Sequence, residues 1–339
     1  MRPRHDRSAG PNCETQINVR DKIESKDGAP SLVGVRSNRL QSNVFNAYVS
    51  VKGNALNTLP RNQKPFQLDR STRDEIALFL AEAALAAGPV VMEEYERGGD
   101  ARSKKDGSPV TLADHRAEAI ICQHLARVAP VTPVIAEEST AAGAQINAAG
   151  RFLLVDPLDG TREFIARNGE FTINVALVEG GAPIAGAVYA PAIDRLWMGG
   201  DRAFVCETRL GTESPDEDMR RRIMTRRAPS SLIALASRSH RDAETESFLN
   251  RLPIGEARSA GSSLKFCVVA EGEGDVYPRF GPTMEWDTAA ADAVLRAAGG
   301  VVLDTAGSPL LYGKFDRGLR NGSFVAWGDA IAARRFGYC

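Results

Sequence analysis

The chain has 339 residues, enough for one large domain or two ordinary ones, and its 43% hydrophobic and 25% charged residues are typical of a soluble globular protein. A formal net charge of -1 excludes the strong overall field that draws a protein to nucleic acid or to an acidic membrane. The 5 cysteines form no CxxC pair, which argues against a disulfide framework or a zinc ribbon and predicts a reducing cytoplasm.

Residues 1–66 are rich in Arg, Asn, Ser, Asp and Gly and show no sustained hydrophobic period, which predicts a disordered N-terminal extension. A targeting or partner-binding arm, or a start codon placed too far upstream, are alternatives that the sequence leaves open. No hydrophobic stretch follows the first basic residues, so we expect no secretory signal. No apolar run approaches the ~20 residues that span a bilayer, so no transmembrane segment is expected.

Helices are predicted over about residues 72–96 and 111–130, where apolar residues recur at helical spacing. Ser71 or Thr72 can cap the first helix and Thr111 the second, because each is followed three residues later by an acid. These helices precede a series of short strands, so the predicted order of elements begins as two helices followed by a sheet.

Short strand-like runs follow at residues 133–138, 151–157, 171–181, 183–191 and 195–200. Residues 206–230 are charged and irregular, and we expect a solvated connector there. After them, strands and helices alternate, which favours an α/β half. The predicted organisation is therefore an extension at 1–66, an α+β half at 67–205 and an α/β half at 206–339.

The stretch FLLVDPLDGTREF, residues 152–164, carries the strongest chemical signal. A buried apolar strand is expected to end at Asp156, and Asp159 follows within one turn. Two acids held that close repel each other unless a cation lies between them, and hard oxygen ligands suit Mg²⁺. The backbone N–H groups of Gly160 and Thr161 can receive a phosphate. Taken alone, this stretch also fits an ordinary turn.

Two further acidic positions follow the same pattern of an acid at the end of an element. Glu137 and Glu138 close the apolar run at residues 133–138, where adjacent acids often cap a helix or face solvent. Asp287 stands just before an alanine-rich helix, where an acid is more often an N-cap than a metal ligand. Three such acidic ends together make a metal cluster more plausible than any one of them does.

The order DPLDGT, with EE upstream and WDTAA downstream, resembles the inositol monophosphatase superfamily of Mg²⁺-dependent, lithium-sensitive phosphatases. The segments SRSH, GSSLKFCVVAEGEGDVYPRFGPT and PLLYGK extend the resemblance to the 3'(2'),5'-bisphosphate nucleotidases of the CysQ type. The resemblance covers about residues 70–328. It implies a layered αβαβα sandwich, an α+β half packed on an α/β half, with the metals between the halves.

The resemblance assigns two or three Mg²⁺ ions to the acidic ends, and it implies inhibition by Li⁺. Glu137, Asp156 and the Leu158 carbonyl are implied as ligands of one ion. Asp156, Asp159 and Asp287 are implied as ligands of a second ion. A pair of metal ions can activate the attacking water and stabilise the leaving oxygen.

The same resemblance implies that Thr161 and Asp114 activate the attacking water, with Glu138 orienting water or ligands from behind. Asp114 lies three residues after Thr111, so a helix-capping role is the alternative. We favour the catalytic interpretation because the other members of the constellation are present.

Substrate selection is implied at positions that match the nucleotide-binding segments of the nucleotidases. Lys265 is expected to meet a second phosphate, which inositol phosphates lack, although a lysine on a helix surface is the alternative. His240 can equally be a solvated loop residue, and Tyr277 a core residue of a strand. The implied substrate-binding residues are Gly160, Thr161, Ser239, His240, Gly261, Ser262, Lys265, Tyr277, Arg279 and Asp287.

The expected reaction converts adenosine 3',5'-bisphosphate to AMP and phosphate, with the sulfated nucleotide PAPS as a possible second substrate giving APS. An inositol-1-phosphate or fructose-1,6-bisphosphate phosphatase is the alternative enzyme, and a nucleotide-binding regulator without catalysis is a second, different class. The expected partner is a small-molecule nucleotide rather than a nucleic acid. The implied location is cytoplasmic, with peripheral attachment to the inner membrane left open, as is the oligomeric state.

Overall fold

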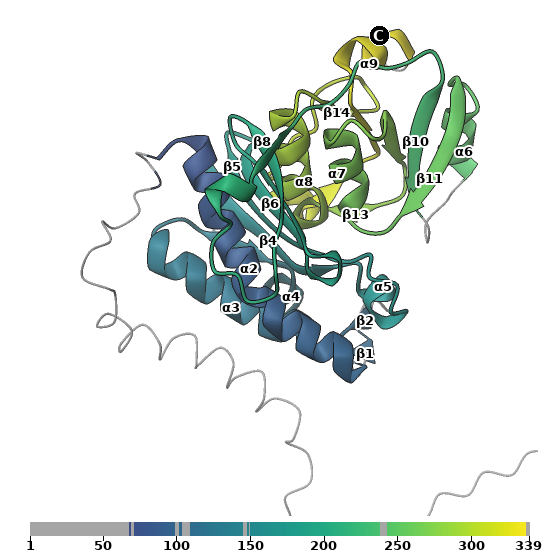
Figure 1. The fold of residues 1–339 in the computed structure, drawn as a ribbon. Coiled ribbons are helices and arrows are strands. Elements are labelled where there is room, and N and C mark those ends of the chain that lie inside the picture. The colour runs from purple at the N-terminus through teal and green to yellow at the C-terminus, as the bar shows by residue number, and fades with distance from the viewer. Residues whose placement is uncertain are drawn as a thin grey trace, which may run out of the picture. The chain divides into compact units, whose positions relative to one another are not determined.

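The structure, a computed structural model, describes residues 68, 71–98, 102–103, 109–144, 148, 150–237 and 243–336 (Figure 1). The described residues all belong to one compact unit, residues 65–339. The predicted N-terminal extension, residues 1–66, lies outside the described residues.

The larger of the two main sheets has seven strands in the order β3-β4-β5-β6-β7-β8-β9. Only β3 and β4 pair in parallel, and every other neighbouring pair in this sheet is antiparallel. Their bounds are β3 Val134–Ala136, β4 Arg151–Asp159, β5 Thr172–Glu179, β6 Ala182–Ala190, β7 Arg195–Gly199, β8 Ala203–Glu207 and β9 Arg221–Ile223. The sheet therefore extends into the segment 206–230, so the prediction of an irregular connector there was wrong for these strands.

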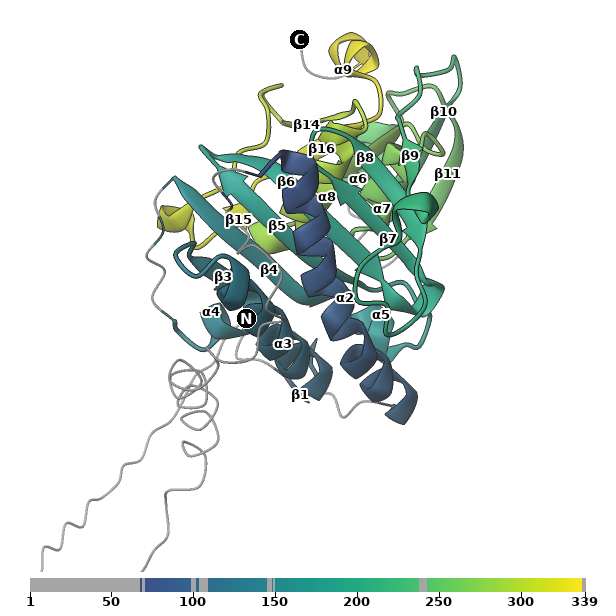
Figure 2. The ribbon, with the colours of Figure 1, turned by 60° about the vertical axis from the view of Figure 1, so that its left-hand side comes forward.

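Helices α2 (Arg73–Arg97) and α3 (Leu112–Val128) cover one face of this sheet, as Figure 2 shows. Both begin with the predicted capping boxes, in which Thr72 pairs with Glu75 and Thr111 pairs with Asp114. The two predicted helices and their caps are therefore confirmed. Helix α2 is long and apolar enough to cross a membrane, which the sequence prediction overlooked, but 67% of its most apolar window is buried in the protein.

The opposite face of the seven-stranded sheet is covered by α7 (Leu264–Ala270) and α8 (Glu285–Ala297). Strand residues alternate between the two faces: Leu153 and Val155 pack toward α2 and α3, whereas Phe152 and Leu154 pack toward α8. Helix α8 lies very close to the sheet, because a Cβ atom on Gly186 would collide with the backbone of Ala290. A Cβ atom on Gly199 would collide with Val294 in the same way.

The smaller main sheet has five strands in the order β11-β10-β12-β16-β14. Strand β10 pairs in parallel with β11 and β12, and β16 is antiparallel to its neighbours β12 and β14. The α/β half is thus a mixed sheet, and the sequence prediction had no strand at β16. The bounds are β10 Leu232–Ser237, β11 Ile254–Ala260, β12 Val276–Arg279, β14 Val301–Asp304 and β16 Phe324–Trp327.

Helices α6 (Ala243–Leu249) and α9 (Ala330–Phe336) pack on the outer face of the five-stranded sheet. The layers are therefore α2 and α3, the seven-stranded sheet, α7 and α8, the five-stranded sheet, and α6 and α9 (Figure 1). This αβαβα order confirms the predicted fold class. The short elements are β1 Arg102–Ser103, β2 Pro109–Val110, α4 Glu137–Ala141, α5 Thr161–Ile165, η3 Pro191–Ile193, η4 Glu217–Met219, β13 Thr283–Met284, η5 Phe315–Arg317 and β15 Arg320–Asn321.

Candidate active site

The end of β4 carries Asp156 and Asp159. The strand continues through both residues, with an irregular register between them: Asp156 stands opposite Asn174, and Asp159 stands opposite Thr172. The expectation that the strand ends at Asp156 is corrected, because the shift in register accommodates the extra residues without ending the pairing. Gly160 then adopts a φ of 91° and α5 begins at Thr161. An L-residue with a side chain rarely adopts that φ, so the glycine allows this sharp exit from the sheet.

Helix α4 carries Glu137 and Glu138 immediately after β3, the strand that neighbours β4. Glu138 is buried. Its backbone N–H donates to the carboxylate of Glu118 at 2.7 Å, and the N–H of Ser139 donates to the same carboxylate at 2.9 Å. Glu118 therefore fixes the start of α4. The sequence analysis missed this residue, although its position four residues after Asp114 on one helix was a usable signal.

Asp287 belongs to the first turn of α8, which begins at Glu285. The predicted position just before the helix was therefore two residues off. The carboxylate of Asp287 still caps the helix from inside, because Oδ2 accepts the backbone N–H of Met284 at 2.8 Å. Its other oxygen, Oδ1, does not cap the helix, so the carboxylate can cap α8 and still bind a metal ion through Oδ1.

The acids at these element ends are close enough to affect one another. Burial raises the pKa of Asp156 well above its usual value, and the neighbouring charges of Glu137, Asp159 and Asp287 raise that pKa further. Burial, and then the charges of Asp159 and Glu137, raise the pKa of Asp287 in the same way. Burial also raises the pKa of Asp159, against the opposing effects of Lys265 and of hydrogen bonds from Ser262. The surroundings of these three acids therefore favour the protonated, neutral form of each carboxyl group.

This group of acids (Glu137, Asp156, Asp159 and Asp287), hereafter the carboxylate group, suits a hard divalent cation. The donors are carboxylate oxygens, which Mg²⁺ prefers, and a cation would relieve the mutual repulsion that raises their pKa values. Within the described part of the chain, however, no three acid, histidine or cysteine side chains are already arranged as a metal centre. The carboxylate oxygens fit Mg²⁺ by their chemistry. In this structure Asp156, Asp159 and Asp287 each accept a hydrogen bond from the protein.

Asp114 and Thr161 come together as the resemblance implied. Asp114 is fully buried, and Oδ2 accepts both the backbone N–H and the hydroxyl of Thr111, at 2.8 and 2.7 Å. The Thr161 hydroxyl lies 3.5 Å from the other oxygen, Oδ1, and 3.3 Å from the Leu158 carbonyl. The capping role of Asp114 is thus present, and its second oxygen faces the end of β4.

Lys265 is buried in α7, with only 4% of its surface exposed, so it is not a lysine on a helix surface. Its Nζ donates to the carbonyls of Ala260 and Ser262, at 3.1 and 2.5 Å. Burial and then the nearby charge of Arg279 lower the pKa of Lys265 to about 8. The Nε of Arg279 is a buried donor without a hydrogen-bond partner among the described residues.

The remaining predicted substrate residues fall into three groups. Gly261 and Ser262 form the turn before α7, where the Ser262 hydroxyl donates to Asp159 at 2.8 Å. Tyr277 is buried in an aromatic cluster with Phe266, so it packs in the core of the five-stranded sheet, and Lys265 Nζ lies 5.2 Å from the centre of its ring. Ser239 and His240 lie outside the described residues.

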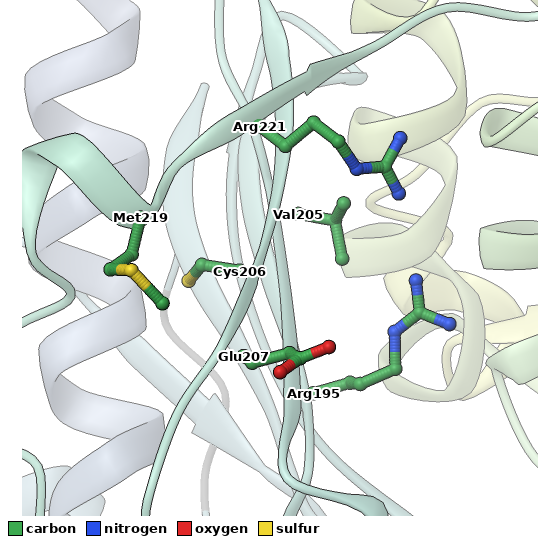
Figure 3. Close-up of a pocket in the computed structure, with 6 residues that line it drawn as sticks. All are labelled: Arg195, Val205, Cys206, Glu207, Met219 and Arg221. Atoms are coloured by element: carbon green, nitrogen blue, oxygen red, sulfur yellow. The ribbon is translucent and has the colours of Figure 1, made fainter.

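A hollow on strands β7 to β9 lies apart from the carboxylate group and is lined by Arg195, Val205, Cys206, Glu207, Met219 and Arg221 (Figure 3). Figure 3 shows the guanidinium groups of Arg195 and Arg221 pointing the same way, away from Met219. Both arginines donate to the buried carboxylate of Glu271, each at 2.9 Å or less. The positive charge of both arginines is therefore paired with a buried acid, whereas the charges that most affect the pKa values of Asp156 and Asp287 are other acids.

Known proteins resemble this chain in both sequence and fold. The 3'(2'),5'-bisphosphate nucleotidase CysQ of Escherichia coli strain K12 is 44% identical over 236 residues, which cover 69% of this chain and 92% of that protein. The CysQ of Buchnera aphidicola subsp. Acyrthosiphon pisum is 37% identical over 236 residues, covering 69% of this chain and 86% of that protein. The crystal structure of CysQ from Bacteroides thetaiotaomicron matches with a TM-score of 0.63 and 39% identity, covering 75% of this chain and 97% of that one.

An inositol monophosphatase from Anabaena (Nostoc) sp. PCC 7120 also shares the fold, with a TM-score of 0.59, 25% identity, and coverage of 77% of this chain and 93% of that one. The layered fold is therefore that of the inositol monophosphatase-like phosphatases, which generally require metal ions. The profile of the Inositol monophosphatase family matches residues 72–333. The chain belongs to this family.

Proposed function

We propose that this chain is a Mg²⁺-dependent 3'(2'),5'-bisphosphate nucleotidase. It hydrolyses the 3'-phosphate of adenosine 3',5'-bisphosphate with one water, giving AMP and inorganic phosphate, and it can take PAPS as a second substrate. The names of the CysQ relatives support the nucleotide substrate. In the cell this reaction would recycle a nucleotide of sulfur metabolism in the cytoplasm, and Li⁺ would inhibit it.

One observation favours a bisphosphate over a monophosphate. Lys265 and Arg279 lie near each other, and Ser262 connects Lys265 to Asp159 of the carboxylate group. Two buried or half-buried cations, one with an unpartnered Nε donor, are suited to a second phosphate beside the phosphate that is hydrolysed. An inositol monophosphate has no group to place there.

The carboxylate group would hold the metal, with Glu137, Asp156 and the Leu158 carbonyl on one side and Asp159 and Asp287 on the other. When bound, Mg²⁺ acidifies the attacking water and neutralises charge that develops on the phosphoryl group. Thr161 would orient that water. Asp114 Oδ1 lies 3.5 Å from the Thr161 hydroxyl, so it is placed to accept the proton through that residue.

Three residues of the proposal have supporting roles. The buried Glu138 would orient water or ligands from behind Glu137. Gly160 and Gly261 would support the substrate site by shaping its turns, because a Cβ atom on either would lie 3.1 Å or 2.6 Å, respectively, from the Glu170 carbonyl oxygen. The boundary near residue 205 between the two halves of residues 67–339 remains a proposal. The seven-stranded sheet continues past this boundary, to Ile223 at the end of β9.

The proposal is tested by measuring phosphate release with Mg²⁺ from adenosine 3',5'-bisphosphate, inositol 1-phosphate and fructose 1,6-bisphosphate. We expect a preference for the nucleotide that Asp159→Asn abolishes. A preference for a sugar phosphate would keep the phosphatase chemistry and overturn the role of Lys265 and Arg279. No release from any substrate by folded protein would favour a nucleotide-binding regulator.

The second phosphate is tested with Lys265→Met, comparing adenosine 3',5'-bisphosphate with adenosine 3'-monophosphate. We expect the KM for the bisphosphate to rise by roughly tenfold or more, because a charged hydrogen bond contributes about 1.5–3 kcal/mol, with little change for the monophosphate. Arg258→Met is the control, since Arg258 pairs with the exposed Glu256 instead. An equal loss on both substrates would mean that Lys265 only supports the turn at residues 260–262.

A further inference from the structure

A set of buried polar side chains connects the two sheets beneath the carboxylate group. Thr172 and Asn174 come from β5 of the seven-stranded sheet, and Ser262 and Ser263 come from the turn that leads from β11 into α7. Thr172, Asn174 and Ser263 each have 1% or less of their surface exposed. Burial of polar groups is costly unless they are hydrogen-bonded, so their contacts show what they stabilise.

The contacts run to two of the proposed metal ligands. Asn174 Nδ2 donates to Ser263 Oγ at 3.1 Å and lies 3.4 Å from Asp159 Oδ2. Ser263 Oγ in turn donates to the backbone carbonyl of Asp287 at 2.8 Å. Ser262 Oγ donates to Asp159 Oδ2 at 2.8 Å. One connected path thus joins the Asp159 carboxylate to the backbone that carries Asp287.

The start of this path is held rigidly by its surroundings. Thr172 Oγ1 lies 2.5 Å from Ser262 Oγ and 3.0 Å from Asn174 Oδ1, within hydrogen-bond distance of both. Ser262 has a φ of 50°, which is unusual for a serine and persists only where neighbours fix it. The backbone N–H of Gly261 donates to Glu170 at 2.8 Å, which anchors the same turn to the segment that follows α5.

The carboxylate group needs such a device because its members come from different layers. Asp159 stands at the end of a strand in one sheet, and Asp287 stands on the helix packed between the sheets. Their negative charges repel, as the raised pKa of Asp287 indicates. Without a rigid connection, repulsion would move the two acids apart whenever no cation lies between them.

We propose that Asn174 and Ser263 are positioning residues, which hold Asp159 and Asp287 at a fixed separation across the layers and thereby set the metal affinity of the carboxylate group. This inference rests on the proposed role of these acids as metal ligands. Asn174 was not singled out from the sequence, because it reads as an ordinary strand residue. Ser263 was named there only as part of the GSSLKF segment, for which the resemblance implies nucleotide binding. Groups that orient metal ligands typically change metal affinity or activity by ~10–100-fold when they are removed.

The test measures Mn²⁺ binding to the substrate-free full-length protein by electron paramagnetic resonance. Ser263→Ala is expected to weaken Mn²⁺ binding by at least about tenfold. Ser323→Ala is the matched control, because the Ser323 hydroxyl also donates to a backbone carbonyl, that of Phe280, and it has no bond to the carboxylate group. Ser263→Thr keeps the hydroxyl and is expected to restore affinity to within about threefold of the original.

Phosphate release then provides a second measurement. If the role is positioning, kcat of Ser263→Ala rises toward the original value at saturating Mg²⁺, while the Mg²⁺ concentration for half-maximal activity stays elevated. Asn174→Ser gives an independent test through the other end of the connection, should Ser263→Ala fail to fold. It is expected to weaken Mn²⁺ binding as well.

The outcomes separate this inference from the proposed function. Tight Mn²⁺ binding by the original protein, unchanged in both Ser263→Ala and Asn174→Ser, would overturn the positioning role and leave the metal site intact. Absence of Mn²⁺ binding by the original protein would overturn the metal site itself. Equal weakening in Ser323→Ala would show a general loss of structure and would also contradict the proposal.

Discussion

Two regions of the molecule bury carboxylates in opposite ways. Beside strands β7 and β9, the carboxylate of Glu271 accepts hydrogen bonds from Arg195 and Arg221, which bring a positive charge with them. At the ends of β4 and α8, the described part of the chain shows no salt bridge to Asp156 or Asp287, and the charges that most affect their pKa values are other acids.

Under the proposed function, the difference separates acids that stabilise the fold from acids that would bind a metal ion. A buried acid that matters only for stability is normally paired, because an uncompensated buried charge is strongly unfavourable. Repelling acids at element ends persist where an external cation supplies the compensation. Exposure alone does not distinguish the two regions, since Glu271 and Asp156 are both almost fully buried. The identity of the partners does.

The largest expected effect comes from Asp156→Asn. We expect kcat/KM to fall by roughly 10³-fold, because metal stabilisation of several kcal/mol would be lost. In metal-free protein, the free energy of unfolding measured in urea should not decrease, since one of several repelling charges is removed. A decrease of several kcal/mol would show that Asp156 stabilises the fold as Glu271 does, and would contradict the distinction between the two regions.

Glu271→Gln should have the opposite profile. Removing this charge leaves two arginines without their shared partner. Because these arginines are 33% and 63% exposed to solvent, the free energy of unfolding is expected to decrease by only about 1.5 kcal/mol. Mn²⁺ affinity should stay unchanged. Glu256→Gln, which alters an exposed pair with Arg258, is the control and should leave stability unaffected. Loss of metal affinity in Glu271→Gln would show that the two regions are coupled.

Lys265 extends the comparison to a buried cation whose hydrogen bonds go to neutral carbonyl groups. Its pKa of about 8 means that the ammonium group loses its proton as the pH rises through that value. We expect the KM for adenosine 3',5'-bisphosphate to rise by ~10-fold between pH 7 and pH 9, with a weaker dependence for adenosine 3'-monophosphate.

Unfolding does not explain this loss of affinity. An unfolded lysine keeps its proton to about pH 10.4, so above pH 8 the unfolded chain binds more protons at this position and the contribution of Lys265 to stability rises with pH. In Lys265→Met, the KM values for adenosine 3',5'-bisphosphate and adenosine 3'-monophosphate should show the same pH dependence. If the difference persists in that variant, another group is responsible for the pH dependence.

The smallest effect is expected from Glu118→Gln. This acid accepts two backbone N–H groups at the start of α4, so it resembles a helix cap, and its loss should cost about 1 kcal/mol in the free energy of unfolding. Because α4 carries Glu137, the Mg²⁺ requirement should also rise by a few-fold. An unchanged Mg²⁺ requirement would separate Glu118 from the carboxylate group and make it a purely structural acid.

The layered fold was predicted through the family resemblance, since periodicity alone gives only a mixed α and β chain. The placement of Asp156 and Asp159 at the end of a strand was predicted from local signals. An apolar run that ends in acids and a glycine is readable without knowing its neighbours. Thr72 and Thr111 were readable as caps for the same reason. These features confirm that local patterning carries much of the information about the elements.

Other features depend on contacts between distant segments and were not predictable. Strand β9 has exposed arginines, as edge strands often do, so its charged residues read as a connector. Glu271, in the polar run AEGEGD, reads as a solvent-facing acid. It is buried because Arg195, 76 residues away in the chain, folds against it. The burial of Lys265 likewise depends on how α7 packs on a sheet.

The glycines at 186 and 199 have a consequence beyond packing. They set the distance between α8 and the seven-stranded sheet, because the helix backbone packs directly on the two positions that lack a side chain. Asp287 lies in the first turn of this helix. Its position relative to the seven-stranded sheet therefore depends on two glycines in the middle of that sheet. A screen for folded but inactive variants should therefore recover replacements of Gly186, and an engineer who reshapes the substrate pocket has reason to leave both glycines untouched.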